Sequence, residues 1–177
     1  MKLLVVVDMQ NDFIDGALGT PEAQAIVPAV AAKVKKYVEN DDAILYTRDT
    51  HFDNYLDTQE GRKLPVPHCI AGTEGWEIRK EVYTTHYNHT IDKYTFGAWD
   101  IGGAVNRLAG FYNADEFESI EIVGLCTDIC VISNAMLLKA YFPEVPISVD
   151  SSCCAGVTPE SHNNALEAMK MCQIDII

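Results

Sequence analysis

The chain has few positive charges. Its 177 residues contain 13 Lys and Arg against 26 Asp and Glu, which gives a formal net charge of −13. No run of five or more basic residues occurs, whereas binding to a phosphate backbone requires clustered Lys and Arg. The composition therefore argues against a nucleic-acid partner.

Long apolar runs are missing as well. No stretch approaches the roughly 20 residues of a membrane-spanning helix, so no membrane association is expected. The apolar run Leu3–Val7 is too short for the hydrophobic region of a secretion signal and ends at Asp8, which favours a strand. The six cysteines include no Cys-x-x-Cys pair. This spacing argues against a zinc ribbon or a disulfide scaffold and favours a reducing, cytoplasmic location.

Short apolar segments rich in β-branched residues alternate with helical patterns. The expected strands are Leu3–Val7, Ala43–Thr47, Thr90–Asp92, Ser119–Val123, Pro146–Val149 and Gln173–Ile177, and the expected helices are Ala25–Glu39, Asp128–Tyr141 and Pro159–Cys172. Pro28 is expected to break or restart the first of these helices. The alternation predicts one α/β domain over residues 1–177. We expect a three-layer, doubly wound, mostly parallel six-stranded sheet with helices on both faces.

Polar residues stand at the ends of the predicted strands. Asp8, Asp49 and Lys93 each follow such a strand, and the segment Gly124–Cys130 follows the strand at 119–123. Ligands of doubly wound folds bind outside the carboxyl ends of the strands. These four distant segments are therefore expected to converge on one crevice.

Cys130 is the candidate nucleophile. The sequence around it predicts a strand, a tight turn and the first turn of a helix, with Thr127 or Asp128 as the N-cap. The N–H groups and the dipole at a helix N-terminus favour a thiolate, and the same N–H groups can stabilise an oxyanion. The competing interpretation is that Cys126 and Cys130 are small buried core residues, as free cysteines often are.

Asp8 and Lys93 have ordinary interpretations of their own, as a strand-end acid and a solvated surface lysine. Beside a cysteine at a helix start, however, they supply a carboxylate that takes the thiol proton and a cation that holds the thiolate. The shared position of the three residues therefore favours a catalytic group.

A second group of side chains has metal-ligand chemistry. Asp49 and His51 lie two residues apart at a strand end, so both side chains leave the same face, and Glu60 and His68 follow in the long loop 52–82. Two imidazoles and two carboxylates suit Zn²⁺, Fe²⁺ or Mn²⁺ with positions left open for water or substrate. The competing interpretation is a polar loop whose Asp and His residues cap turns, and it weighs most for Glu60. The other histidines, His86, His89 and His162, are expected at the surface or in packing.

Five ordered segments resemble one family. They are Val6–Phe13, Thr47–His51, Pro67–Thr73, Asp92–Trp99 and Gly124–Val131. Together they resemble the isochorismatase-like cysteine hydrolases, and within them the nicotinamidases of the pyrazinamidase type. The resemblance implies a mostly parallel sheet, a general base at Asp8, a nucleophile at Cys130 and a third catalytic residue at Lys93. It also implies a cis peptide at Leu125–Cys126, with the main-chain N–H groups of Cys126 and Cys130 as the oxyanion hole.

The resemblance further implies one divalent metal ion, with zinc first and iron or manganese as alternatives. The implied ligands are Asp49, His51 and His68, with Glu60 as a variable fourth ligand and Asp53 and Asp57 as competitors for that place. In nicotinamidases the ion binds the ring nitrogen of nicotinamide while the amide carbon faces the thiolate. The implied reaction converts nicotinamide to nicotinic acid and ammonia through a thioester.

One departure from the family pattern concerns the substrate wall. Many nicotinamidases carry an aromatic residue just before a Pro-Pro-His motif, where this chain has Leu64. Phe13 is expected on one wall of the substrate site, and Phe96 or Trp99 on the other. The segment Asp53–Leu64 is the expected mobile lid.

Three other functions compete with this prediction. The first is a related cysteine hydrolase acting on another small amide or on an N-carbamoyl or ureido compound, which would not need the metal ligands. The second is a non-catalytic metal- or redox-responsive module in which Cys126 and Cys130 pair. The third is isochorismate cleavage with a carrier domain, and it fits least because those enzymes depart from the cysteine pattern. Family members are often oligomeric, so a homo-oligomer is one expected state, although no interface can be read from the sequence.

Overall fold

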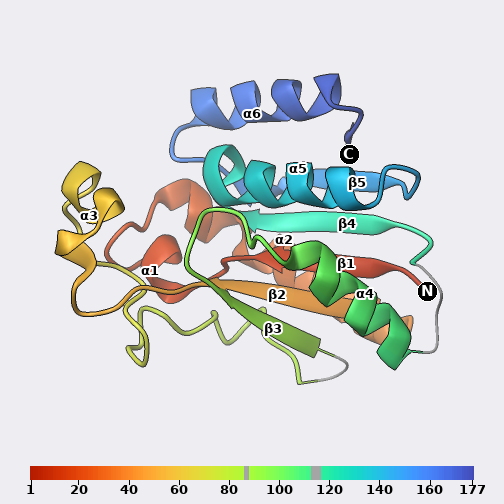
Figure 1. The fold of residues 1–177 in the computed structure, drawn as a ribbon, viewed down its shortest axis with the longest axis horizontal. Coiled ribbons are helices and arrows are strands. Elements are labelled where there is room, and N and C mark those ends of the chain that lie inside the picture. The colour runs from red at the N-terminus through yellow and green to blue at the C-terminus, as the bar shows by residue number, and fades with distance from the viewer. Residues whose placement is uncertain (86–87, 113–116) are drawn as a thin grey trace.

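A computed structural model describes residues 1–85, 88–112 and 117–177 (Figure 1). Six parallel strands form one sheet in the order β3-β2-β1-β4-β5-β6. The strands are β1 (Leu3–Val7), β2 (Ala43–Asp49), β3 (Asn88–Lys93), β4 (Ile120–Leu125), β5 (Ile147–Ala155) and β6 (Asp175–Ile176). The expected six-stranded parallel α/β sheet is confirmed.

Eight helical segments accompany the strands in the described part of the chain. They are α1 (Asn11–Ile14), α2 (Pro21–Glu39), the 3₁₀ turn η1 (Tyr55–Asp57), α3 (Gln59–Lys63), α4 (Ile101–Phe111), the π turn η2 (Thr127–Val131), α5 (Ile132–Tyr141) and α6 (Pro159–Met171). The short helices α1 and α3 and the longer α4 were not predicted. Three glycines within α4 lower its helix propensity, and its packing against the sheet outweighs that cost.

The expected break at Pro28 is wrong. Helix α2 begins at Pro21, after the Thr20 side chain caps the N–H of Ala23, and it continues through Pro28 to Glu39. Pro28 removes one backbone donor, the partner of the carbonyl four residues earlier. Both Pro28 and Gln24 face solvent, so water can satisfy that carbonyl. The buried stripe on the other side of α2 holds the helix on the sheet.

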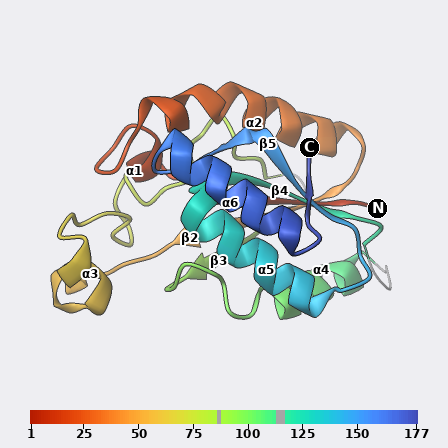
Figure 2. The same ribbon diagram turned by 90° about the horizontal axis from the view of Figure 1, so that it is seen from above.

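Helices cover both faces of the sheet, as Figure 2 shows for α2 on one side and for α4 and α5 on the other. Alternate residues of β1 enter the two cores. Leu4 and Val6 pack with the α2 side, whereas Leu3, Val5 and Val7 pack with the α4 and α5 side. This two-sided burial explains why the strand is apolar at every position.

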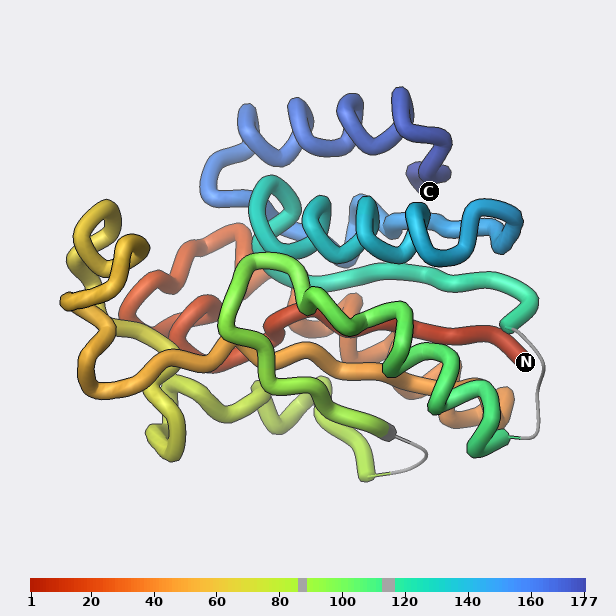
Figure 3. Tube along the Cα trace, in the orientation of Figure 1, coloured from red at the N-terminus to blue at the C-terminus, as the bar shows by residue number. Residues whose placement is uncertain are grey.

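The order of the strands reverses between β1 and β4. The chain moves outward from β1 to β2 and β3, and it then returns across the sheet to β4 on the other side of β1 (Figure 3). A doubly wound sheet opens a crevice at this switch point, outside the carboxyl ends of the strands. Asp8 follows β1 and the η2 turn follows β4, so both lie at the crevice.

In the part of the chain that the structure describes, no helix combines the length and apolar character needed to cross a membrane.

Candidate active site and metal cluster

The backbone of the sheet places three charged residues side by side. Asp49 and Lys93 are the last residues of β2 and β3 and are register partners in the sheet, so they end their strands rather than follow them. Asp8 follows β1 with a φ of 47°, a conformation that non-glycine residues seldom adopt. Its carboxylate accepts a hydrogen bond from the Thr47 hydroxyl on β2 at 2.7 Å.

Lys93 links the expected catalytic residues. Its Nζ atom lies 2.7 Å from Oδ2 of Asp8, 3.0 Å from Oδ1 of Asp49 and 3.4 Å from Sγ of Cys130. All four side chains are buried. Burial lowers the pKa of Lys93, but the neighbouring Asp8, Cys130 and Asp49 groups outweigh it and raise that pKa well above its ordinary value. The ammonium therefore remains charged in the interior.

The pKa of the Cys130 thiol lies above its ordinary value, although its neighbours act on it in opposite directions. Burial raises the pKa of the thiol, the Asp8 carboxylate raises it further, and Lys93 lowers it. Burial also raises the pKa of Asp8. The Oδ2 atom of Asp8 receives no well-directed hydrogen bond despite its ion pair with Lys93. This oxygen therefore has a lone pair available for the thiol proton.

The segment that carries Cys130 is a π turn, a geometry often found at functional sites. The cis peptide at Leu125–Cys126 is present as expected. The expected N-cap is wrong, because Cys126 occupies the N-cap position and no side chain caps the turn. Thr127 instead contacts Nδ1 of His162 through its hydroxyl at 2.8 Å, and the Asp128 carboxylate accepts the N–H of residue 157 at 3.1 Å. The two side chains thus contact α6 and the residue two positions before it, because that helix packs against the turn.

A glycine near the end of β4 allows this strand to approach β1 closely. Gly124 has a φ of 121°, and a Cβ atom there would lie 2.0 Å from the carbonyl oxygen of Val7. Only glycine tolerates this backbone conformation and this contact. The close approach brings the ends of β1 and β4 together, and with them Asp8 and Cys130.

The predicted metal ligands form a cluster next to the expected catalytic residues. One ligand atom from each of Asp49, His51, Glu60 and His68 lies within 4.8 Å of all the others. The Nε2 atom of His51 is 3.0 Å from Oδ2 of Asp49 and 3.5 Å from Oε1 of Glu60. The Nε2 atom of His68 is 3.7 Å and 3.8 Å from the same two oxygens. The competitors Asp53 and Asp57 are not members of this cluster.

The cluster fits a divalent metal ion. Tetrahedral bonds of about 2.1 Å place neighbouring ligand atoms about 3.4 Å apart, and the four distances between an imidazole nitrogen and a carboxylate oxygen span 3.0 to 3.8 Å. The Nδ1 atom of His68 lies 2.8 Å from the carbonyl oxygen of Val66, so it carries the proton and leaves Nε2 free to bind a metal. The buried Nε2 atom of His51 has no well-directed hydrogen bond.

Charge also favours a cation here. Burial lowers the pKa of His51, but the nearby carboxylates of Asp49 and Glu60 outweigh it and raise the pKa to about 9. The two carboxylates thus stabilise positive charge at the centre of the cluster. Asp49 belongs to both groups, since Oδ1 contacts Lys93 and Oδ2 faces the two imidazoles.

Two residues that support the cluster were missed in the sequence. Gln10 is buried and clamps the backbone of Asp49, with Oε1 accepting its N–H at 2.7 Å and Nε2 donating to its carbonyl at 2.8 Å. The ring of Tyr55 contacts His51 and His68 edge-on, at centroid distances of 4.7 and 5.1 Å. A polar residue two positions after Asp8 was the available signal for Gln10, whereas nothing in the sequence marks Tyr55.

The predicted substrate-wall residues lie in two places. The Phe13 ring is 5.5 Å from the His68 ring, which puts it beside the metal cluster. Leu64 ends α3, and its carbonyl accepts the Tyr55 hydroxyl at 2.9 Å. Phe96 and Trp99 belong to the segment after Lys93 and are 48% and 77% exposed. The structure therefore brings Phe13 to the cluster and leaves Phe96 and Trp99 on the surface.

The remaining histidines agree with a packing or surface role where they are described. His89 is exposed and contacts the ring of Phe111. His162 is partly buried against Thr127. His86 lies outside the described residues.

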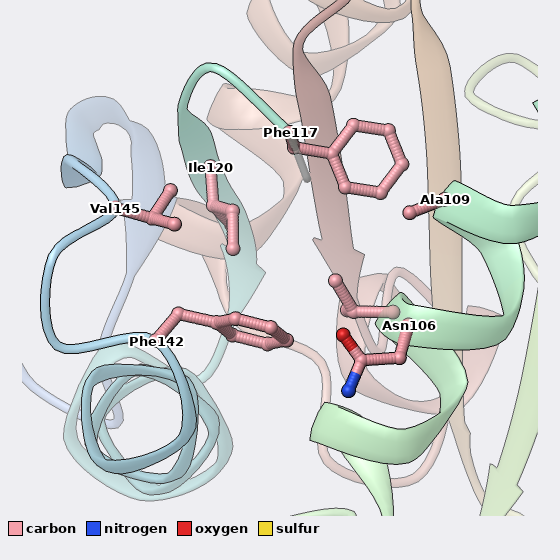
Figure 4. A pocket seen from close by; sticks show the side chains of 7 residues that line it. Asn106, Ala109, Phe117, Ile120, Phe142 and Val145 are labelled. Carbon is pink, nitrogen blue, oxygen red and sulfur yellow. The ribbon is translucent and has the colours of Figure 1, made fainter. Parts of the chain in front are cut away.

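A separate apolar cavity lies at the opposite end of the sheet (Figure 4). Its lining is Val105, Asn106, Ala109, Phe117, Ile120, Phe142 and Val145. Ile120 begins β4, whereas the η2 turn follows the end of that strand. Among the residues that the structure describes, this lining contains no acid, base or thiol.

Comparison with known proteins places the chain in a family. A family model described as the isochorismatase domain matches residues 2–177. The nicotinamidase/pyrazinamidase of Mycobacterium tuberculosis is 24% identical, over 100% of this chain and 98% of that protein.

Two solved structures share the fold and about a quarter of the sequence. The pyrazinamidase of Pyrococcus horikoshii in complex with zinc is 28% identical, with a TM-score of 0.81 over 99% of this chain and 98% of that one. The pyrazinamidase/nicotinamidase of Streptococcus mutans is 28% identical, with a TM-score of 0.82 over 100% of both chains. Because the family model spans all but the first residue, this chain belongs to the isochorismatase family, as its resemblance to the cysteine hydrolases of that family predicts.

Proposed function

We propose that this hydrolase is a metal-assisted cysteine amidohydrolase that converts nicotinamide to nicotinic acid and ammonia. One observation carries the proposal: Asp49 contacts Lys93 through one carboxylate oxygen and faces His51 and His68 through the other. A nucleophile and a ligand-binding ion would therefore act on two ends of one small substrate. The similarity to nicotinamidases and pyrazinamidases of other organisms supports the same reaction.

The proposed cycle begins with proton transfer from Cys130 to Oδ2 of Asp8, while Lys93 stabilises the thiolate. The thiolate attacks the carboxamide carbon, and the main-chain N–H groups of Cys126 and Cys130 hold the oxyanion. Asp8 then gives the proton to the amide nitrogen of the tetrahedral intermediate, and the C–N bond breaks to release ammonia and leave a thioester on Cys130. Water, deprotonated by Asp8, hydrolyses the thioester and releases the acid and the thiol.

Asp49, His51, Glu60 and His68 would hold the ion. Two nitrogens and two carboxylate oxygens favour zinc, with iron or manganese as alternatives. When bound, the ion supplies a Lewis acid that orients the substrate through its ring nitrogen. Phe13 would form one wall of the ring site, with Leu64 and either Phe96 or Trp99 on the other side.

The test is ammonia release from nicotinamide by the purified protein, before and after chelation and after metal is restored. We expect turnover that is lost with chelation and returns with zinc. Cys130→Ala should abolish turnover and leave metal content unchanged. Near-normal turnover by Cys130→Ala would contradict the mechanism.

A second candidate function is hydrolysis of another small amide or ureido compound by the same catalytic group. The observation that favours it is Leu64, an aliphatic residue that is 38% exposed and stands where many nicotinamidases carry an aromatic residue. If the metal-loaded protein releases no ammonia from nicotinamide while Cys130 remains reactive, this candidate replaces the first. A cytoplasmic location and a homo-oligomeric state remain predictions.

A further inference from the structure

A buried polar residue outside the proposed catalytic group connects two parts of the site. Asn134 lies in the first turn of α5 and is 0% exposed. Its Nδ2 atom donates to the carbonyl oxygen of Cys130 at 2.8 Å, and its Oδ1 atom accepts the N–H of Ala98 at 2.9 Å. A longer contact of 3.5 Å joins Nδ2 to the carbonyl oxygen of Phe96. One side chain thus contacts the nucleophile's backbone and the segment that follows Lys93.

The first contact fixes the π turn. Asn134 reaches back four residues to Cys130, and its neighbour Ser133 reaches back four residues to the carbonyl of Ile129 at 2.6 Å. Side chains that bond to a carbonyl of the preceding turn alter helix geometry locally. The pair of contacts therefore constrains the backbone on which the Cys130 thiol stands.

The second contact fixes the segment 94–100, which we call the aromatic loop because it carries exposed Tyr94, Phe96 and Trp99. This loop joins Lys93 at the end of β3 to the start of α4. It is pressed against α5, since a Cβ atom on Gly97 would lie 2.7 Å from Cδ1 of Leu137.

The backbone N–H of the loop at Ala98 needs a partner. Ala98 is buried, and a buried N–H without an acceptor is costly. Asn134 supplies that acceptor from α5. The aromatic loop is thereby tied to the helix that follows the nucleophile.

We propose that Asn134 is a positioning residue whose hydrogen bonds hold the aromatic loop against the π turn that carries Cys130. This tie sets how Lys93, the residue before the loop, meets Cys130, and it sets the position of Phe96 and Trp99, the candidates for one substrate wall. The structural part of this proposal is independent of the substrate, whereas its catalytic consequence rests on the proposed function.

Two substitutions separate the two contacts. In Asn134→Thr the hydroxyl can still donate to the Cys130 carbonyl, as Ser133 does one residue earlier, but it is too short to accept the N–H of Ala98. In Asn134→Leu both contacts are lost at similar volume. Ser133→Ala is the matched control, because it removes a back-bonding hydroxyl from the same helix turn and keeps the Cβ atom that faces Gly97 of the loop.

Two measurements, neither of which needs a substrate, report separately on Cys130 and on the aromatic loop. The rate of Cys130 alkylation by iodoacetamide, followed by peptide mass spectrometry, reports the nucleophile. Fluorescence anisotropy of Trp99, in a Trp76→Phe background, reports the loop. We expect Asn134→Thr to lower the anisotropy and to keep the alkylation rate within about twofold. Asn134→Leu should lower the anisotropy and slow alkylation by about tenfold, the effect of one lost hydrogen bond. Ser133→Ala should leave the anisotropy unchanged.

Steady-state kinetics then give the catalytic consequence. For Asn134→Thr we expect a KM about tenfold higher with little change in kcat, because the substrate wall moves while the nucleophile stays in place. Unchanged anisotropy in Asn134→Thr, or equal slowing of alkylation in both variants, overturns the proposal. If the wild-type protein does not hydrolyse nicotinamide, the proposed function fails while alkylation and anisotropy still decide the role of Asn134.

Discussion

Replacing Lys93 with methionine removes a buried ammonium and leaves the carboxylates of Asp8 and Asp49 without the cation that lies 2.7 Å and 3.0 Å away. Breaking a buried ion pair by deleting one partner costs about 3–5 kcal/mol. A chain of this size loses about 2–4 °C of melting temperature per kcal/mol. We therefore expect the metal-free Lys93→Met variant to melt roughly 10 °C below the wild type.

A double-mutant cycle shows whether charge is the cause. Asp8→Asn removes one of the two stranded carboxylates, so Lys93→Met should cost at least about 1 kcal/mol less in that background. The free energies of unfolding of the wild type, the two single variants and the double variant are measured by urea titration with chelator present. Lys80→Met, at an exposed site, is the control and should change stability by less than about 0.5 kcal/mol. Strictly additive effects of the Lys93 and Asp8 substitutions would refute the electrostatic reasoning.

Three further changes test other parts of the structure. Glu60→Gln should weaken zinc binding at least about tenfold in a competition titration, whereas Asp57→Asn should not; the reverse ranking would reassign the fourth ligand. Gly124→Ala should lower the free energy of unfolding by more than about 4 kcal/mol, because the new methyl group meets a β1 carbonyl; a soluble variant of normal stability would contradict that contact. Burial raises the pKa of Asp150, but hydrogen bonds and the charge of Lys33 outweigh it and lower that pKa. The stability advantage of the wild type over Asp150→Asn should therefore be present above pH 3.8, the ordinary value, and disappear as the pH falls through the lower folded-state pKa; an advantage that grows on acidification would have the wrong sign.

The residues at strand ends were predictable because parallel strands end at a common edge. Apolar runs identified β1, β2 and β4. Asp8, Lys93 and Cys130 were then singled out because each lies at the end of a predicted strand or shortly after it. That Asp49, His51, Glu60 and His68 lie close together was also predictable, because the chain has only five histidines and two of them follow soon after β2.

Other features depend on packing that no local pattern encodes. The route of α2 through Pro28 depends on which side of the helix meets the sheet. The contact of Tyr55 with the two imidazoles and the tie from Asn134 to Ala98 join residues far apart in the chain. Their side chains resemble ordinary core or loop residues when only their neighbours in sequence are known.

The spatial order of the strands has a kinetic consequence. Lys93, Asp49, Asp8 and Cys130 come from β3, β2, β1 and β4 or from the residues just after them, and these strands are consecutive across the sheet. No hairpin or local fragment contains two neighbouring parts of the site, because every pair of strands here is parallel and joined by a long crossover. During refolding, thiol reactivity of the native kind and metal retention should therefore appear together and late, after the non-local strand pairs have formed. Assembly of the candidate site thus reports the pairing of β3, β2, β1 and β4.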